Sequence, residues 1–279
     1  MDRRSFLRLG LLGAGSAVLA PRLLGSALPR AWAADGPYGP LQLADANGIQ
    51  LPAGFTSRVV ARSGQSVTGT GYVWHAAPDG GACFSVPGGG WVYASNSELG
   101  SGAGGVGVLR FAPDATVSDA YQVLSGTNRN CAGGATPWGT WLSCEEVADG
   151  RVWECDPLGV TPAAARPAMG RFNHEAAAVD PLGRAVYLTE DAPDGRLYRF
   201  RPTTWPDLGA GTLEVATVSG SSVTWSAVPD PDGSPTATRY QVAASTAFSG
   251  GEGAWYASGK VWFTTKGDNR VWELDVRAT

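Results

Sequence analysis

The stretches "TWLSCEE" (140–146) and "RVWECDP" (151–157) decide the fold of this chain. Apolar and polar residues alternate in both, as in half-buried β-strands, and a short polar connector separates them. The same strand pair recurs as "WVYASNSE" (91–98) with "GVLRFAP" (107–113), "AVYLTED" (185–191) with "RLYRFRP" (196–202), and "KVWFTTKGD" (260–268) with "RVWELDV" (270–276). Antiparallel strand pairs repeated along a chain are typical of the blades of a β-propeller.

The spacing of the repeats agrees with propeller blades. Their centres fall near Tyr93, Leu142, Tyr187 and Trp262, so the first three are 45 to 50 residues apart, the period of a four-stranded blade. The longer last interval contains two further strand-like stretches, 211–220 and 222–231. A lead-in precedes each pair, and we expect it to form the innermost strand beside the central channel. The lead-ins are "WHAAPDGGACF" (74–84), "NCAGGATPWG" (130–139), "FNHEAAAVDPLG" (172–183) and "FSGGEGAWYASG" (248–259).

We therefore predict an all-β fold, a β-propeller domain over residues 34–279 with about four blades and very little helix. The composition fits, because 39 Gly and 19 Pro among 279 residues suit short strands joined by tight turns. The sequence stops at "VWELDVRAT", directly after a strand. We expect the propeller to be incomplete at this end, with weakened metal binding and little activity in the chain as it stands.

The first 33 residues resemble a targeting signal. Paired arginines, Arg3 and Arg4, precede "SFL", an apolar run occupies 9–20, and "AWA" at 31–33 offers small residues for cleavage. The run is short, rich in glycine and followed by Pro21, so we do not expect it to span a membrane. We predict a twin-arginine signal peptide over 1–33 and export to the periplasm or the extracellular space, with no stable membrane anchor after cleavage.

The charge balance excludes one class of partner. The formal net charge is -4, and the body of the chain has no Lys/Arg cluster, so a nucleic-acid partner is not expected. An anionic small molecule would need bound cations to be recognised.

The four cysteines, Cys83, Cys131, Cys144 and Cys155, allow three disulfide connectivities. If "DG" at 149–150 forms a two-residue hairpin turn, Cys144 lies opposite Cys155 and a cross-strand disulfide is geometrically possible. We favour free thiols here, because the geometry of a cross-strand disulfide is demanding.

Acidic residues gather at matching points of the repeats. One group of acids lies at the end of the first strand of each pair. A second group lies in the lead-ins, together with Cys131. We expect Glu98, Glu145, Glu175 and Glu190 to face one central funnel together with Cys131. The first group is Glu98, Glu145, Glu146, Glu190, Asp191 and Asp268; the second is Cys131, Glu175 and Glu252.

Carboxylates that converge repel one another unless cations neutralise them, which favours a metal cluster. With two histidines, and neither a CxxC nor an HExxH motif, a three-His zinc site is excluded. Carboxylates favour calcium, magnesium, manganese or ferric iron, whereas a thiolate suits a transition metal, so two kinds of metal are indicated. The alternative is that the acids are solvated turn residues at strand ends, and spacing alone does not separate the two interpretations.

Several of these motifs together resemble the PhoX-type alkaline phosphatases, over about residues 50–275. They are "RRSFL", "NCAGGATPWGTWLSCEE", "GRFNHEAAAVDP", "VYLTEDAPDGRLYRF" and "KGDNRVWELD". The resemblance implies a six-bladed propeller exported by the twin-arginine route. It also implies ferric iron, Fe(3+), and calcium, Ca(2+), as cofactors, and hydrolysis of phosphate monoesters.

The resemblance also assigns residues. Cys131 matches the family's cysteine iron ligand, and Glu175 matches the carboxylate of its "HE" motif. Glu145 and Glu146 match probable metal ligands, and Glu190 and Asp191 lie at another acidic position of the family. With Glu98, which follows from the repeat, the predicted metal ligands are Cys131, Glu145, Glu146, Glu175, Glu190, Asp191 and Glu98.

The resulting interpretation is a monomeric, secreted, metal-dependent phosphatase acting on a small-molecule phosphate ester. Two alternatives stay open: a calcium-stabilised propeller that binds a ligand without catalysis, and a propeller-type lactone hydrolase with one divalent ion. Metal analysis distinguishes them, because iron together with calcium supports only the phosphatase.

Overall fold

The structure, a computed structural model, describes residues 36–277. The predicted signal peptide at 1–33 lies outside the described residues. The chain divides into two compact units at Val59 and Val60. Within residues 36–277, no helix is long and apolar enough to cross a membrane.

Residues 36–59 form turns with a single isolated bridge between Leu41 and Pro52. Asp45 organises the central turn, because its Oδ1 accepts hydrogen bonds from the backbone N–H groups of Asn47 (2.8 Å) and Ile49 (3.1 Å). The ring of Tyr38 packs edge-on against Phe55.

The second unit contains four antiparallel sheets, each built from consecutive strands that pair with their neighbours in chain order. We call them the first to fourth blades. The first blade is β1 (Pro78–Ser85), β2 (Trp91–Ser97), β3 (Gly104–Phe111) and β4 (Val117–Thr127). The second is β5 (Asn130–Ala135), β6 (Trp141–Glu145), β7 (Val152–Cys155) and β8 (Ala164–Ala165). The third is β9 (His174–Asp180), β10 (Ala185–Glu190), β11 (Leu197–Thr204), β12 (Asp207–Ser219) and β13 (Ser222–Ala227), and the fourth is β14 (Gly251–Ala257), β15 (Lys260–Thr265) and β16 (Arg270–Asp275).

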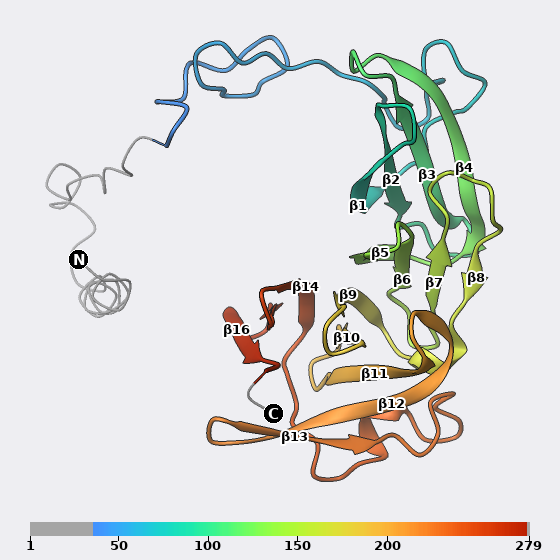
Figure 1. Cartoon of the computed structure of the whole chain (residues 1–279), viewed down its shortest axis with the longest axis vertical. Helices are drawn as coiled ribbons and strands as arrows, with labels where there is room; N and C mark the ends of the chain where they lie inside the picture. Colours follow the sequence, from blue (N-terminus) through green and yellow to red (C-terminus); the bar gives the residue numbers. More distant parts are fainter. Residues whose placement is uncertain (1–35, 278–279) are drawn as a thin grey trace, which may run out of the picture. The chain divides into compact units, whose positions relative to one another are not determined.

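The predicted all-β propeller architecture is confirmed. The only helical segments among the described residues are two 3-10 turns, η1 (Pro167–Met169) and η2 (Thr238–Tyr240). Every lead-in supplies the first strand of its sheet, and these strands, β1, β5, β9 and β14, contact one another in that order (Figure 1). The strand-like stretches in the long last interval become β12 and β13 of the third blade.

The apolar core lies between successive blades. Along β10, side chains alternate between two clusters, because neighbouring residues of a strand face opposite sides of the sheet. Val186 and Leu188 pack with residues of the second blade such as Leu142, whereas Tyr187 packs with residues of the fourth blade such as Phe263. The middle strands β6 and β10 are therefore buried on both faces, whereas β15 of the fourth blade buries only alternate residues. The repeated aromatics act mainly as packing between blades.

The hairpin after β6 corrects one expectation from the sequence. The "DG" pair is not a two-residue turn, because the chain turns over a longer segment in which Glu145 N–H donates to Arg151 O (3.0 Å). The register places Cys144 opposite Val152 and Cys155 opposite Trp141, so the two cysteines do not face each other. All four cysteines are free, as favoured from the sequence for Cys144 and Cys155.

Small residues allow the inner strands to approach closely. A Cβ on Gly134 of β5 would lie 1.8 Å from the carbonyl oxygen of Ala177 in β9, a distance that no side chain tolerates. A Cβ on Gly253 of β14, in contrast, would have no atom within 4 Å. The contact between the second and third blades therefore depends on the absence of a side chain at residue 134.

We predict that Gly134→Ala lowers the free energy of unfolding by about 1–3 kcal/mol, because the added methyl group forces β5 and β9 apart. The matched substitution Gly253→Ala should leave it unchanged or raise it by up to about 1 kcal/mol, since alanine loses less chain entropy on folding. Urea denaturation of both variants and the parent measures the difference. Equal effects of the two substitutions would contradict the close contact.

Candidate metal centre

The same backbone hydrogen bond recurs at one end of every blade. The backbone N–H of the residue just after the second strand donates to the carbonyl of the residue immediately before the inner strand. The four bonds are Glu98 N to Ala77 O (2.9 Å), Glu146 N to Arg129 O (2.9 Å), Asp191 N to Asn173 O (3.0 Å) and Lys266 N to Gly250 O (2.9 Å). We call the four donor residues, Glu98, Glu146, Asp191 and Lys266, the closing ring.

A second set of equivalent residues lies two positions after each accepting carbonyl. These are the second residues of the inner strands, Asp79, Cys131, Glu175 and Glu252, which we call the inner ring. The pairing register of every inner strand shifts across this position. Such bulges turn a side chain out of the regular alternation, and they occur often beside active sites. The two rings bring carboxylates, a thiol and an ammonium group to one end of the blades.

The backbone just before the inner strand is unusual in three blades. Ala77 and Arg129 both have φ of 45°, and Gly250 has φ of 66°. For Ala77 and Arg129 this left-handed region is sparsely populated and costs free energy, so the surrounding hydrogen bonds must hold it in place, whereas glycine adopts it readily.

The tightest group in the two rings is Cys131, Glu146 and Glu175, whose ligand atoms all lie within 4.8 Å of one another. The Cys131 Sγ lies 3.4 Å from Glu175 Oε1 and 3.6 Å from Asp79 Oδ2. Metal–oxygen distances for ions such as calcium are about 2.3–2.6 Å, so ligands on opposite sides of an ion are separated by about 5 Å. The spacing of the three residues fits one metal ion among them.

Electrostatics at the centre also fits a cation. Burial, together with Glu252 and other nearby carboxylates, raises the pKa of Glu175 to about 8 despite a hydrogen bond from Cys131. Burial and the neighbouring Asp191 raise the pKa of Glu146 to about 7. Burial and the charge of Glu175 raise the pKa of the Cys131 thiol. A metal ion would reverse these shifts by favouring the ionised ligands.

Glu145 and Glu190 are not part of this group, which corrects the expected funnel. Glu145 is buried and accepts hydrogen bonds from Asn128 N (2.8 Å), Arg151 N (3.1 Å) and Trp153 Nε1 (3.0 Å). Its side chain is therefore satisfied by its own blade and the loop before β5.

Glu190 repeats this arrangement in the third blade. It accepts hydrogen bonds from Arg196 N (3.0 Å) and Tyr198 OH (3.0 Å), and it pairs with Arg239 (2.9 Å). Of each adjacent pair of acids, the first stays inside the blade and the second, Glu146 or Asp191, joins the closing ring.

Sequence reasoning also missed residues of the site and its support. Asp79 was detectable, since it holds in "PDGG" the place that Cys131 holds in "NCAGG". In the fourth blade, the residue equivalent to Glu146 is Lys266 and not Asp268. Asp268 instead accepts a hydrogen bond from Thr265 Oγ1 and pairs with Arg270 (3.2 Å).

Two buried polar residues hold inner strands in place from the preceding blade. Asn96 Nδ2 donates to the carbonyl of Cys131 (2.8 Å), while its Oδ1 accepts from Trp141 Nε1 and Ser143 Oγ (both 2.8 Å). In the third blade, Thr189 Oγ1 donates in the same way to the carbonyl of Glu252 (2.6 Å). Buried groups satisfied on every side fix the backbone of the inner ring.

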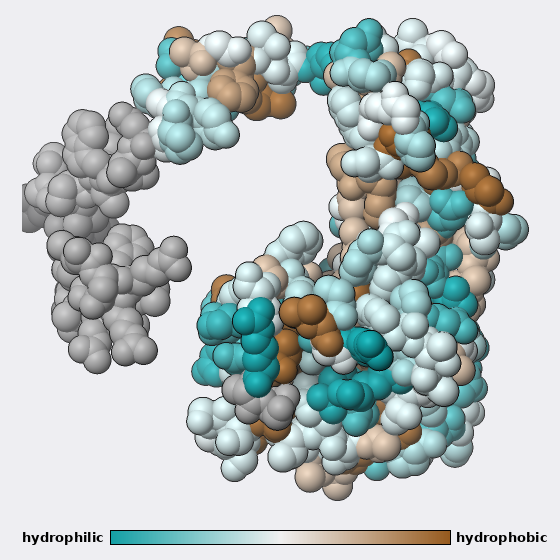
Figure 2. All heavy atoms as spheres, in the orientation of Figure 1, coloured by the Kyte–Doolittle hydropathy of each residue, from teal (hydrophilic) through white to brown (hydrophobic). Residues whose placement is uncertain are grey.

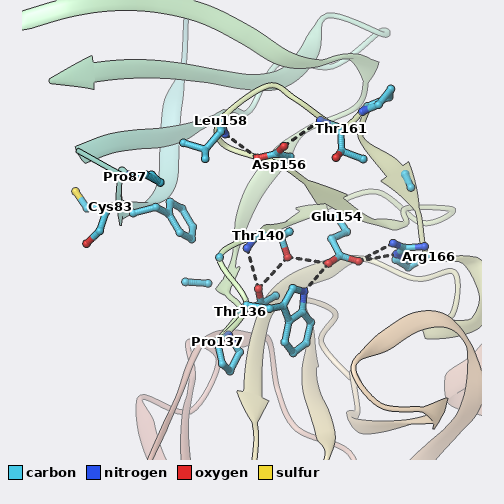
Figure 3. A pocket seen from close by; sticks show the side chains of 17 residues that line it. Cys83, Pro87, Thr136, Pro137, Thr140, Glu154, Asp156, Leu158, Thr161 and Arg166 are labelled. Carbon is cyan, nitrogen blue, oxygen red and sulfur yellow. Dashed lines mark hydrogen bonds and ion pairs between the residues drawn. The ribbon is translucent and has the colours of Figure 1, made fainter. Parts of the chain in front are cut away.

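A separate cavity of about 830 Å³ lies at the opposite end of the first two blades, around Thr136–Thr140 (Figure 3). Its Glu154 accepts hydrogen bonds from Trp138 Nε1 (2.8 Å) and Thr140 Oγ1 (2.7 Å) and pairs with Arg166 (2.7 Å). Because these polar groups satisfy one another, they do not converge on a ligand as the two rings do. In the view of Figure 2, hydrophobic residues form small separate groups on a mainly polar face.

The fold and the site together define a class of protein: a β-propeller whose blades direct a thiol and carboxylates to one end. The family model described as alkaline phosphatase PhoX matches residues 91–154 and 148–278, which is more than half of the chain. The chain belongs to the PhoX alkaline phosphatase family.

A solved structure agrees with the fold of this family. It is described as "Pseudomonas fluorescens PhoX in complex with vanadate, a transition state analogue", and it matches with a TM-score of 0.55 and 18% identity. The match covers 67% of this chain and 58% of that one, so this chain spans little more than half of its relative. No curated protein matched in sequence.

Two other solved structures are less similar. The computationally designed Ika4 protein matches with a TM-score of 0.39 and 10% identity, over 79% of this chain and 99% of that chain. A chain of a nidogen/laminin complex matches with a TM-score of 0.38 and 11% identity, over 72% of this chain and 76% of that chain.

We predict that the adjacent glutamates of the second blade behave oppositely when metal is removed with a chelator. Glu145→Gln should lower the free energy of unfolding by about 1–3 kcal/mol, because its amide NH₂ opposes a buried donor. Glu146→Gln should leave stability unchanged or raise it, since it removes a charge from a crowded group. Chemical denaturation of both variants tests this, and comparable destabilisation by Glu146→Gln would show that Glu146 is also a structural carboxylate.

Proposed function

We propose that this chain carries the metal centre of a phosphatase that hydrolyses phosphate monoesters. The observation that supports it is the grouping of Cys131, Glu146 and Glu175 within 4.8 Å in a member of the PhoX family. Cys131 would hold ferric iron, because a thiolate prefers a transition metal, and the surrounding carboxylates would hold calcium. When bound, these ions would supply the positive charge that neutralises the phosphoryl oxygens of the substrate.

The residues of the chain have distinct tasks in this proposal. Cys131, Glu146 and Glu175 bind the metal, and Asn96 fixes the backbone that carries the thiol. Glu145 and Glu190 hold the ends of β6 and β10, so that Glu146 and Asp191 keep their positions in the closing ring. This division gives each ligand a rigid support, on which tight metal binding depends.

The acidic character of the site makes a cation essential for this function. A phosphate monoester is an anion, and the closing and inner rings face it with carboxylates. Without bound metal the two would repel each other, whereas neutralised carboxylates can position the ester and a water molecule. We therefore expect substrate binding to depend on metal loading.

We predict that the purified chain contains iron and calcium, and that Cys131→Ser lowers its iron content by at least about tenfold. Cys83→Ser, at an exposed thiol of β1 outside the two rings, is the matched control and should keep the metal. Elemental analysis measures both. Hydrolysis of an aryl phosphate should disappear on chelation.

Two results would contradict the proposed function. Hydrolysis that a chelator does not reduce would exclude a role for the metal, and equal iron in Cys131→Ser and the parent would exclude Cys131 as a ligand. Calcium without iron, together with no hydrolysis, would favour a propeller that binds a ligand without catalysis.

We also propose that the protein is exported by the twin-arginine route. The support is the "RRSFL" motif and the small residues at 31–33, all outside the described part of the chain. The prediction is that the full chain reaches the periplasm of a twin-arginine-competent bacterium in a shortened form. Replacing both Arg3 and Arg4 by lysine should retain it, at full length, in the cytoplasm. Cell fractionation measures this, and equal export of the two forms would disprove the route.

A further inference from the structure

The closing ring carries a lysine in the fourth blade where the other three blades carry carboxylates. The backbone at Lys266 is equivalent to that at Glu98, Glu146 and Asp191, because the same hydrogen bond, from Lys266 N to Gly250 O (2.9 Å), defines the position. The four positions therefore have equivalent backbones and differ in the charge of the side chain.

The ammonium group of Lys266 lies between two carboxylates. Its Nζ is 2.5 Å from Asp191 Oδ2, in the closing ring of the third blade, and 2.8 Å from Glu252 Oε1, in the inner ring of its own blade. Asp191 is mostly buried and Glu252 is partly buried, with 11% and 29% of the side chain exposed. These distances approach those at which carboxylate oxygens surround a calcium ion, about 2.3–2.6 Å.

The surrounding backbone leaves room for the lysine stem. A Cβ on Gly250 would lie 2.8 Å from the Cγ of Lys266 and 3.2 Å from Asp191 Oδ1. Gly250 therefore lets the aliphatic chain pass beside the strand and reach the two acids. The ion pairs of Lys266 with Asp191 and Glu252 therefore depend on both Lys266 and Gly250.

The space between Asp191 and Glu252 is equivalent to the one that the candidate metal ligands occupy between the second and third blades. There, Cys131 and Glu146 of the second blade meet Glu175 of the third blade. Among the described residues neither glutamate forms an ion pair with a basic side chain, although the charge of Lys266 lowers the pKa of Glu146. Between the third and fourth blades, the equivalent space between Asp191 and Glu252 contains the Lys266 ammonium.

We propose that Lys266 is a tethered cation that takes the place of a metal ion between Asp191 and Glu252, and so confines metal binding to the side of the site around Cys131. This inference rests on the proposed function, because it assumes that the remaining carboxylates hold metal. The residue acts by charge and position, and it sets how many ions this chain binds.

The test compares calcium stoichiometry of the full chain with that of Lys266→Met and Lys266→Glu, by equilibrium dialysis with elemental analysis. Removal of the ammonium leaves Asp191 and Glu252 uncompensated, so Lys266→Met should bind one additional calcium ion per chain. Lys266→Glu, which restores the carboxylate found in the other blades, should bind the additional ion more tightly. Circular dichroism of each variant checks that it is folded.

Two controls isolate the role of position. Lys266→Arg keeps the cation and should keep the parent stoichiometry. Lys260→Met removes the same charge at the other end of β15, where Lys260 pairs with Glu273, and should also leave the stoichiometry unchanged.

The outcomes separate this inference from the proposed function. Equal, non-zero calcium binding by the parent, Lys266→Met and Lys266→Glu would overturn the inference and leave the metal centre intact. Calcium binding by the two variants but not by the parent would support the inference and contradict calcium binding by the native centre. No binding by any protein would contradict both.

Discussion

One backbone hydrogen bond, repeated in each blade, determines the rest of the site. It joins the residue after the second strand to the residue immediately before the inner strand, with N···O distances of 2.9–3.0 Å. Because this bond closes each blade at the same end, it places a closing-ring and an inner-ring side chain in the same relation four times. The chemistry of the centre then depends on which side chains occupy eight equivalent positions, and much less on the long outer strands.

Like-charge repulsion is the second constraint, and the chain meets it in three ways. Glu145 and Glu190 accept hydrogen bonds inside the blades from several donors, namely backbone N–H groups, Trp153, Tyr198 and Arg239. Asp191 and Glu252 share the ammonium of Lys266. Glu146 and Glu175 are compensated less well: burial and neighbouring carboxylates raise their pKa values to about 7 and about 8, although the charge of Lys266 and a hydrogen bond from Cys131, respectively, lower them. These two carboxylates lie within 4.8 Å of the Cys131 thiol, and this grouping is the strongest physical argument for a metal there.

Much of this could be predicted from the sequence, and the exceptions share one cause. Alternation of apolar residues in stretches such as 185–191 located the strands, and the repeat brought Cys131, Glu146 and Glu175 to one end. The repeat did not show which of Glu145 and Glu146 points to the site. When two adjacent acids end a strand, the alternation pattern is compatible with either one facing the centre. The bulges that re-aim the inner-ring side chains leave no mark in the alternation, and the same applies to the long turn that moved Cys144 away from Cys155.

The lysine of the fourth blade shows why a repeat must be read by backbone position before residue type. Asp268 looks equivalent to Glu146 when acids are aligned with acids, yet the hydrogen bond to Gly250 assigns that place to Lys266. A substitution of carboxylate by ammonium changes the local charge by two units without altering the blade, because both side chains leave the backbone at the same point. A propeller can therefore change the number of cations at its centre through single residues of the closing ring, while the packed faces between its blades stay the same.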